Sequence, residues 1–348
     1  MRSPLLLLLV VLAPLTLLAC GEGDGGQGGG GGGGGPGADT ALPFPPRAAE
    51  PAEAPPPGEG PAGRVVAVGR GPEGVAFDPE TGLVAVGTRE PDRLILVDGR
   101  SGEVRERVPI PSAPRHLALA EPGGPVLVPS EDANALAEVS LPGGETRVTE
   151  VGENPHDVAF LDGRIYVGDE FSSTLSVLEE GRRVRQVPLD VQPGGIVSLD
   201  DQIAAISVRA YTIELFEQGS LTGQGAQNSG YGPTHGVRDD QGRIYVTDTR
   251  GEALNVFQTQ PRLRFVGRVP LEGSPYGIAI DRERGRVWVT LVGRNQVVEL
   301  AVGDQPRVGR TFPTVRQPNS LAVDPATGRL FIASRNAGTL QILDPAGG

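Results

Sequence analysis

Gly277-Ile278-Ala279-Ile280-Asp281 is a short apolar segment that recurs, in seven versions, along the chain. The copies span residues 74–78, 116–120, 157–161, 195–199, 236–240, 277–281 and 320–324. Their first residues are 42, 41, 38, 41, 41 and 43 positions apart, so the repeat is about forty residues long. A fixed period in this range is typical of solenoids and propellers.

Each repeat contains four segments with the alternation that favours β-strands. In the first repeat, the turn Asp78-Pro79-Glu80-Thr81-Gly82 leads from the opening segment to the second strand, Leu83-Val84-Ala85-Val86. A third strand follows at residues 93–98. The fourth, at residues 104–108, is more polar, which suits an outer edge strand. No segment has a long 3.6-residue period, so we expect very little helix. Four-stranded sheets repeated around an axis form a propeller, and the sequence therefore predicts an all-β, seven-bladed β-propeller.

The two ends of the repeat region predict how the ring closes. The last repeat ends at about Asp344 and lacks a fourth strand, whereas Arg64-Val65-Val66-Ala67-Val68 precedes the first repeat without partners of its own. We predict that residues 64–69 pair with the strand from Leu340 to Leu343 and complete the last blade. This closure hides both sheet edges and defines a propeller domain at residues 63–348.

The N-terminal residues predict export and lipidation. Met1-Arg2-Ser3-Pro4 precedes an apolar run at residues 5–18, which is too short for a comfortable membrane span. Leu17-Leu18-Ala19-Cys20 resembles the lipobox of bacterial lipoproteins, and Cys20 is the only cysteine of the chain. The resemblance implies a signal peptide at residues 1–19 and an acylated Cys20. Membrane lipid would then be a partner, with the protein anchored to a bacterial membrane at the cell surface or in the periplasm. The alternative is an ordinary cleaved signal with a chance cysteine.

Residues 20–62 are predicted to be a disordered tether that follows the lipidated cysteine. Gly28 to Gly35 is an unbroken glycine run, and residues 43–61 are rich in Pro, Ala and Glu. Neither part carries enough apolar surface to offset the entropy of ordering, so we expect a spacer between membrane and domain. The net charge of −12 excludes nucleic acid as a natural partner, because that partner requires a basic surface.

Two motifs within the repeats resemble a known family. Asn154-Pro155-His156-Asp157-Val158-Ala159 and Tyr245-Val246-Thr247-Asp248 are similar to the entry and the second strand of the YVTN-type β-propeller repeat. The resemblance covers about residues 63–348, although segments such as Val126-Leu127-Val128-Pro129 lack the tyrosine. It implies the propeller fold. Related seven-bladed propellers include lactonases and a streptogramin lyase.

The fold family implies that ligands meet the face where each loop enters its innermost strand. The residues at that position, one before each opening segment, are Glu73, Arg115, His156, Gly194, His235, Tyr276 and Asn319, and the next position adds His116 and Asp157. All three histidines of the chain fall in this ring, and histidine titrates near neutral pH. The candidate catalytic residues are Glu73, His156, Asp157 and His235. The candidate ligand-binding residues are Arg115, His116, Tyr276, Asn319 and Arg238.

Structural explanations stand beside these assignments. The repeat itself favours Tyr, His or Arg at the entry position, where the side chain caps the seam between blades. Arg238 replaces the Ala or Val of other innermost strands, so it is either an anion contact in the channel or one half of an internal ion pair. Residues 219–231, rich in Gly and amides, are expected to replace the fourth strand of blade four with a mobile loop that leads to His235, or to leave the blade broken.

Two function hypotheses remain open. The first is a non-enzymatic binding or scaffolding module that presents the channel face to a protein or a small ligand. The alternative is a lactonase-like or lyase-like enzyme that uses the histidines and Glu73 for acid–base work. The sequence predicts no cofactor and no metal site, because no haem, P-loop, dinucleotide or H-x-x-x-H motif occurs.

Overall fold

The computed structural model describes residues 47–347. The predicted signal peptide, Cys20 and the first part of the predicted tether lie outside this range. Within it, 28 β-strands form seven four-stranded antiparallel sheets, and helix is limited to the 3-10 turns η1 (Val292–Arg294) and η2 (Pro345–Gly347). No helix in this part of the chain has the length and apolar character needed to cross a bilayer. The prediction of an all-β, seven-bladed β-propeller is therefore confirmed.

The first six blades each contain four strands that are consecutive in the chain. Blades one and two comprise β2 (Val75–Phe77), β3 (Leu83–Thr88), β4 (Arg93–Asp98), β5 (Val104–Pro109), β6 (Ala118–Leu119), β7 (Val126–Ser130), β8 (Ala135–Val139) and β9 (Thr146–Glu150). Blades three and four comprise β10 (Pro155–Leu161), β11 (Arg164–Asp169), β12 (Thr174–Glu179), β13 (Arg182–Pro188), β14 (Pro193–Ser198), β15 (Gln202–Ser207), β16 (Thr212–Glu217) and β17 (Gly223–Asn228). Blades five and six comprise β18 (Pro233–Arg238), β19 (Arg243–Asp248), β20 (Ala253–Gln258), β21 (Arg264–Pro270), β22 (Pro275–Asp281), β23 (Arg286–Leu291), β24 (Gln296–Ala301) and β25 (Arg307–Pro313).

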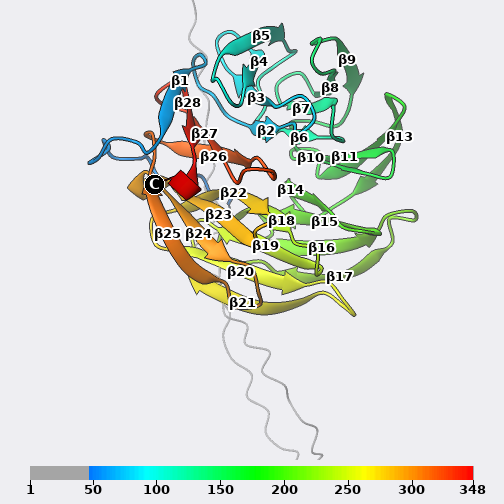
Figure 1. Cartoon of the computed structure of the whole chain (residues 1–348). Coiled ribbons are helices and arrows are strands. Elements are labelled where there is room, and N and C mark those ends of the chain that lie inside the picture. The colour runs from blue at the N-terminus through cyan, green and yellow to red at the C-terminus, as the bar shows by residue number, and fades with distance from the viewer. Residues whose placement is uncertain (1–46, 348) are drawn as a thin grey trace, which may run out of the picture. The chain divides into compact units, whose positions relative to one another are not determined.

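The seventh blade joins the two ends of the described chain. It consists of β26 (Pro318–Val323), β27 (Leu330–Ser334), β28 (Thr339–Leu343) and β1 (Arg64–Ala67), in that spatial order. Val65 lies opposite Gln341 and Val66 opposite Leu340, which confirms the predicted closure. In Figure 1 the outer strands follow one another around the rim from β5 to β25, and β1 lies beside β28.

The hydrophobic core is divided among the seven seams between neighbouring blades. Each seam holds one cluster of buried side chains from two adjacent sheets, and no blade has a complete core of its own. At the closing seam, Val84 and Ile95 of blade one pack with Phe331 and Leu340 of blade seven, and Phe77 stacks on Phe331 with ring centroids 5.1 Å apart. Because each seam is shared by two neighbouring blades, closing the ring adds the seventh seam to the six that the consecutive blades form.

The outer strand of blade four corrects one expectation. The Gly-rich and amide-rich segment forms β17, which pairs with β16 from Thr212↔Asn228 to Phe216↔Gly223. All six residues of β17 are exposed. Pairing at an outer edge uses the backbone, so a strand there does not need the apolar alternation on which the sequence prediction relied.

In blades three and five, the aspartate that ends the second strand holds the loop that leads into the first strand of the same blade. Asp248 Oδ1 accepts hydrogen bonds from the amides of Tyr231 (3.0 Å) and Gly232 (2.8 Å). Asp169 accepts from the Gly152 amide at 3.0 Å in blade three. These aspartates occupy the final position of the motif that resembles the YVTN repeat, so the motif fixes the loop from which the entry residue projects.

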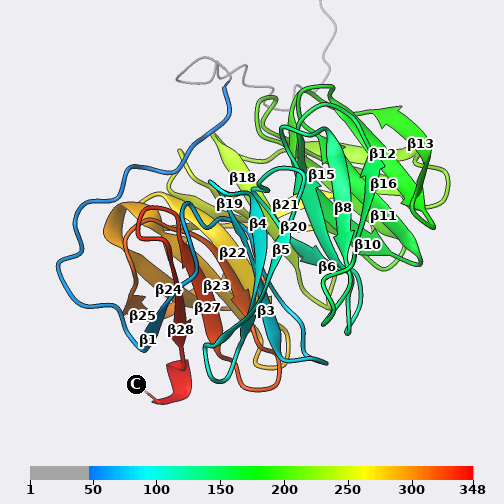
Figure 2. The same cartoon turned by 90° about the horizontal axis from the view of Figure 1, so that it is seen from above.

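Residues 47–62, which we call the strap, precede β1 as an extended segment without regular secondary structure (Figure 2). Tyr211 Oη accepts from the Arg47 amide at 3.0 Å, the Ala52 amide donates to Ser274 Oγ at 2.9 Å, and the Ala54 amide donates to the Gln317 side chain at 2.8 Å. This part of the predicted tether therefore lies against blades four to seven, and it differs in this respect from a free spacer. Composition did not reveal the difference, because these hydrogen bonds use the strap's backbone.

Candidate functional site

The entry residues face the channel because of a local irregularity that recurs in the innermost strands. In blades three to seven, each first strand begins with a proline and its register then slips by one residue. In β10 the slip falls between Pro155 and Asp157, so the additional residue is His156. A β-bulge redirects the side chain that it contains. The bulges thus turn the predicted entry residues of these blades toward the mouth of the channel.

The three histidines meet at this mouth. The ring centroid of His116 lies 4.9 Å from that of His156 and 4.3 Å from that of His235. His235 also meets the edge of the Tyr276 ring, with centroids 4.4 Å apart. His116 therefore bridges blades three and five, which are not neighbours, and the three rings form one layer across the channel.

The hydrogen bonds and burial of this layer fix its protonation state. His156 Nδ1 lies 2.9 Å from the Gly194 carbonyl and His235 Nδ1 lies 3.0 Å from the Tyr276 carbonyl, so both rings donate from Nδ1. Burial, with the charge of Arg115, lowers the pKa of His156 to about 3, and burial lowers the pKa of His235 to about 4. Burial also places the pKa of His116 well below its ordinary value. All three rings are neutral at pH 7.

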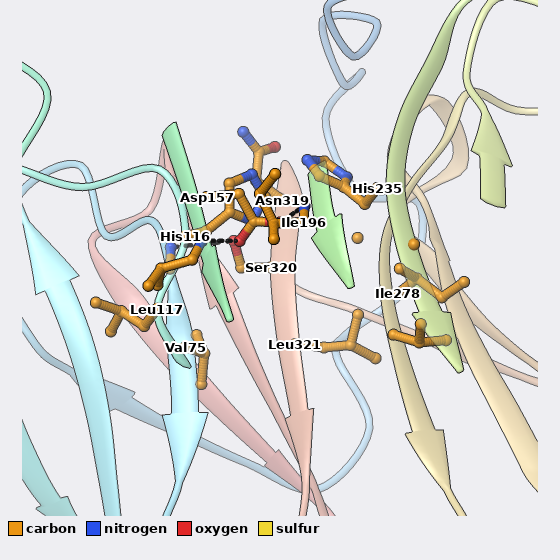
Figure 3. Close-up of a pocket in the computed structure, with 15 residues that line it drawn as sticks. Val75, His116, Leu117, Asp157, Ile196, His235, Ile278, Asn319, Ser320 and Leu321 are labelled. Atoms are coloured by element: carbon orange, nitrogen blue, oxygen red, sulfur yellow. Dashed lines mark hydrogen bonds between the residues drawn. The ribbon is translucent and has the colours of Figure 1, made fainter. Parts of the chain in front are cut away.

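A cavity of about 200 Å³, the channel cavity, lies on one side of the histidine layer. Figure 3 shows His116, Asp157 and His235 at its polar end, and Leu117 and Leu321 on its apolar wall. Asp157 accepts the amides of Ile196 (2.8 Å) and Val158 (2.9 Å), but burial raises the pKa of its carboxyl to about 7.

A second cavity, the mouth chamber, has a volume of about 250 Å³ and lies between the blades and the strap. Its charged and polar lining residues are Glu50, Arg115, Glu131, Asn154, His156, Glu170, Gln192, Thr234, His235 and Tyr276. Burial raises the pKa of Glu170 to about 7, and this carboxylate has Gln192 as a hydrogen-bond partner at 3.2 Å. The chamber therefore combines the positive charge of Arg115 with the carboxyl groups of Glu50, Glu131 and Glu170.

An ion-pair network surrounds the chamber. Arg89 donates to Glu131 at 3.0 Å and lies 3.7 Å from Glu73. Glu73 also accepts from Asn319 Nδ2 at 3.0 Å and lies 3.7 Å from Arg335. Glu73 is thus engaged by residues of blades one and seven, and it lines neither cavity. The structure consequently does not bring Glu73 together with the histidines as one catalytic ring.

Of the remaining predicted site residues, all but Arg238 line one of the two cavities. His116, Asp157 and Asn319 line the channel cavity, whereas Arg115 and Tyr276 line the mouth chamber. Arg238, near the end of β18, lines neither cavity. It pairs with Asp200 of the neighbouring blade at 2.7 Å, and the Asp200 side chain is 87% exposed.

Sequence reasoning missed the charged residues that directly follow the second strands. Glu131 follows β7 and Glu170 follows β11, and both lie at the mouth. Arg89 and Arg335 follow β3 and β27 in the same way. In an antiparallel pair, the end of the second strand lies at the same edge as the start of the first. The position after each second strand was therefore a readable signal for these residues.

Metal binding has no support in residues 47–347, where no group of three or more His, Asp or Glu is arranged to hold an ion. Two of the histidines use Nδ1 for backbone carbonyls, and the third has a buried Nε2 without a hydrogen-bond partner. The layer is a neutral partition between the two cavities.

Comparison with known proteins supports the fold class. No family model matches the chain. Peptidyl-glycine alpha-amidating monooxygenase A of Xenopus laevis is 40% identical over 68 residues, which are 17% of this chain and only 7% of that protein.

Among solved structures, the hydrazine synthase of Kuenenia stuttgartiensis has a TM-score of 0.69 at 15% identity, covering 81% of this chain and 97% of that one. A catalytically inactive histidine-to-alanine variant of Staphylococcus aureus virginiamycin B lyase, with quinupristin, has a TM-score of 0.67 at 13% identity, with coverages of 80% and 98%. A chain of the mitotic checkpoint complex has a TM-score of 0.71 at 10% identity, with coverages of 84% and 96%. These likenesses define the chain as a seven-bladed β-propeller by fold.

Proposed function

We propose that this chain is an exported, membrane-anchored binding module whose mouth chamber receives a small ligand or a side chain of a partner protein. The observation that carries the proposal is the chamber itself, in which polar groups from blades two to six converge on one cavity. Two of the three histidines that line the cavities use Nδ1 for backbone carbonyls. Such rings can orient a ligand and separate the two cavities, but they are poor proton donors at neutral pH.

A thermal-shift screen tests the binding role. The full-length chain, in detergent, is heated with a library of small organic acids, amides, sugars and peptides. A ligand that binds only the folded state raises the melting temperature, and the rise grows with the logarithm of ligand concentration above the dissociation constant. Tyr276→Phe, which removes one hydroxyl from the chamber, should weaken a hit, whereas Tyr166→Phe in a blade interior should leave its affinity unchanged. A screen without any stabilising compound would contradict the binding role.

The membrane anchor is a separate part of the proposal and has its own test. The lipobox-like Leu17-Leu18-Ala19-Cys20 and the glycine run after it support acylation of Cys20. In a bacterial host, Cys20→Ala should move the protein from the membrane fraction to the soluble exported fraction and abolish incorporation of labelled palmitate. An unchanged membrane fraction would overturn the anchor while leaving the binding role intact. The proposal also includes membership of the YVTN-type repeat family, supported by the buried Tyr166 and Tyr245 of its second strands.

A lyase or lactone hydrolase is the second candidate, and a specific observation favours it. Asp157, with a pKa of about 7, shares the channel cavity with His116 and His235. A carboxyl group with that pKa can exchange a proton near neutral pH. Virginiamycin B lyase, whose histidine-to-alanine variant is catalytically inactive, shares the fold. His156→Ala and His235→Ala should abolish any lactone-cleaving or ester-cleaving activity, with Asp200→Ala as a surface control. Unchanged turnover would end this candidate.

A further inference from the structure

We propose that the mouth chamber is a carboxylate-binding site, and that Glu50 of the strap occupies it in the absence of ligand. This inference rests on the proposed binding function and names the chemical class of its ligand. The strap places one carboxylate on Arg115, with Glu50 Oε2 2.9 Å from Arg115 Nη1. Every other charged residue of the chamber comes from the blades.

Arg115 has hydrogen-bonding capacity beyond its contacts with the blade residues Tyr276 and Glu131. The nearest blade carboxylate, Glu131, already accepts from Arg89 at 3.0 Å, and its distance to Arg115 Nε is 3.5 Å. Arg115 Nε is buried and has no hydrogen-bond partner. A guanidinium presents several donors in a plane and binds a carboxylate best when two of them are engaged. Arg115, with one donor on Glu50, is thus suited to a carboxylate that enters the chamber more deeply.

The Glu50 contact is one that a ligand can displace. The Glu50 side chain is 59% exposed, whereas that of Arg115 is 22% exposed. Ion pairs with an exposed partner contribute little to stability, so an incoming carboxylate exchanges for Glu50 at little cost. The strap itself does not depend on this pair, because its backbone is held at Arg47, Ala52 and Ala54. Displacement therefore moves one side chain and does not require the strap to leave.

The chamber also supplies a surface against which a bound acid can rest. Tyr276 lies between the histidine layer and the strap, since its ring packs on His235 and on Ala54 of the strap. Phe171, 61% exposed, lies at the rim. At about 250 Å³ the chamber is slightly smaller than the ~300–1,000 Å³ typical of drug-sized ligands. It accommodates a small organic acid or the acidic side chain of a peptide.

Two probes distinguish these two sources of the carboxylate. Succinate represents a small acid, and a synthetic peptide with the strap's sequence, residues 47–57, represents an acidic peptide; the same peptide with Gln for both glutamates is its control. Binding to the full-length chain in detergent is measured by calorimetry and by the NMR shifts of the three histidine rings. Chloride at equal ionic strength controls for screening. Binding of succinate alone assigns a small acid, and binding of the Glu peptide alone assigns a peptide.

Matched variants test the role of each partner. Glu50→Gln removes the internal competitor and should raise the affinity of the probe about two- to fivefold, which corresponds to about 0.4–1 kcal/mol. Glu53→Gln, at another glutamate of the strap, is the control: the Glu53 side chain is 85% exposed, and its loss should change nothing. Arg115→Gln should abolish binding, and Arg115→Lys, which keeps the charge and the fold, should weaken it. Arg294→Gln, in a surface pair with Glu272, is the arginine control.

The outcomes separate this inference from the proposed function. If neither probe binds the Glu50→Gln variant, or if binding survives Arg115→Gln, the carboxylate site is overturned. In either case, a library compound of another class that stabilises the chain would still support the binding role. A library without any hit overturns the binding role itself.

Discussion

Glu50 and Arg115 form an ion pair of 2.9 Å although 65 residues separate them in the chain. The pair joins the strap to the entry of blade two, so the segment before the first repeat reaches the mouth of the channel. Further along, Ala54 of the strap is buried against Tyr276 and Val292. The strap is consequently part of the face that the sequence predicts to meet ligands.

The attachment of the strap can be tested at Tyr211. Its hydroxyl accepts from the Arg47 amide at 3.0 Å, donates to the Arg47 carbonyl at 2.9 Å, and contacts Arg250. Tyr211→Phe removes these hydrogen bonds, each worth about 0.5–1.5 kcal/mol, while keeping the ring. Hydrogen exchange of the amides of residues 47–50 should become several-fold faster. Tyr166→Phe, whose hydroxyl contacts Gln218, is the control; equal protection in both variants would contradict the docking.

Ring closure predicts a position-specific effect of proline in β1. The Val68 amide donates to Gly338, so the alternation of the strand directs the Val66 amide toward β28 and the Val65 amide away from it. Val66→Pro should lower the free energy of unfolding by at least ~1 kcal/mol, because it removes a ladder bond. Val65→Pro should have a much smaller effect in the same urea titration. Equal losses would argue against this pairing.

The histidine layer makes a prediction for NMR. Burial lowers the pKa of His156 to about 3 and that of His235 to about 4, and it holds the pKa of His116 well below its ordinary value. The three ring signals should therefore stay constant between pH 5 and pH 8, apart from small effects of neighbouring groups. In urea-unfolded protein the same signals should titrate near the ordinary value of about 6.5. A ring that titrates near 6.5 in the folded protein would contradict its burial.

The contribution of Asp157 to the stability of the folded protein should become less favourable as the pH rises. Its pKa is raised to about 7 in the folded protein, so between about pH 4 and pH 7 the folded state keeps a proton that the unfolded state has lost. The contribution of Asp157 to the free energy of unfolding should therefore fall as the pH rises through this window, by up to about 4 kcal/mol. The buried histidines act in the opposite sense below about pH 6.5, because only the unfolded chain takes up their protons.

Urea titrations from pH 4 to pH 8 can isolate the Asp157 contribution. The difference in free energy of unfolding between wild type and Asp157→Asn should decrease as the pH rises. Asp200→Asn, at a side chain that is 87% exposed, is the surface control in the same titrations. A constant difference for Asp157→Asn would show that its carboxyl is ionised throughout.

Asp248 tests the structural role of the final motif residue. Its Oδ1 accepts from the amides of Tyr231, Gly232 and Gly251, at 3.0, 2.8 and 3.0 Å. Asp248→Ala leaves these buried donors unsatisfied, and the expected loss is about 1–3 kcal/mol of unfolding free energy. Asp200→Ala should lose less than about 0.5 kcal/mol. A loss at Asp248 no larger than at Asp200 would contradict the loop-securing role.

The sequence by itself determined the number of blades, their strand order and the closing strand, because apolar alternation and repeat spacing are local and periodic. It also identified the entry position of each blade, including His116, His156 and His235. It did not reveal β17 of blade four, since backbone pairing at an exposed edge leaves no apolar pattern. Only the tertiary structure decided which entry residues meet. Distances across the channel depend on ring closure and on the bulges. These place His116 between His156 and His235. Glu73 is instead engaged by Asn319 of blade seven. The position of the strap was likewise decided by tertiary contacts, because side chains of distant blades hold its backbone and its composition carries no sign of them.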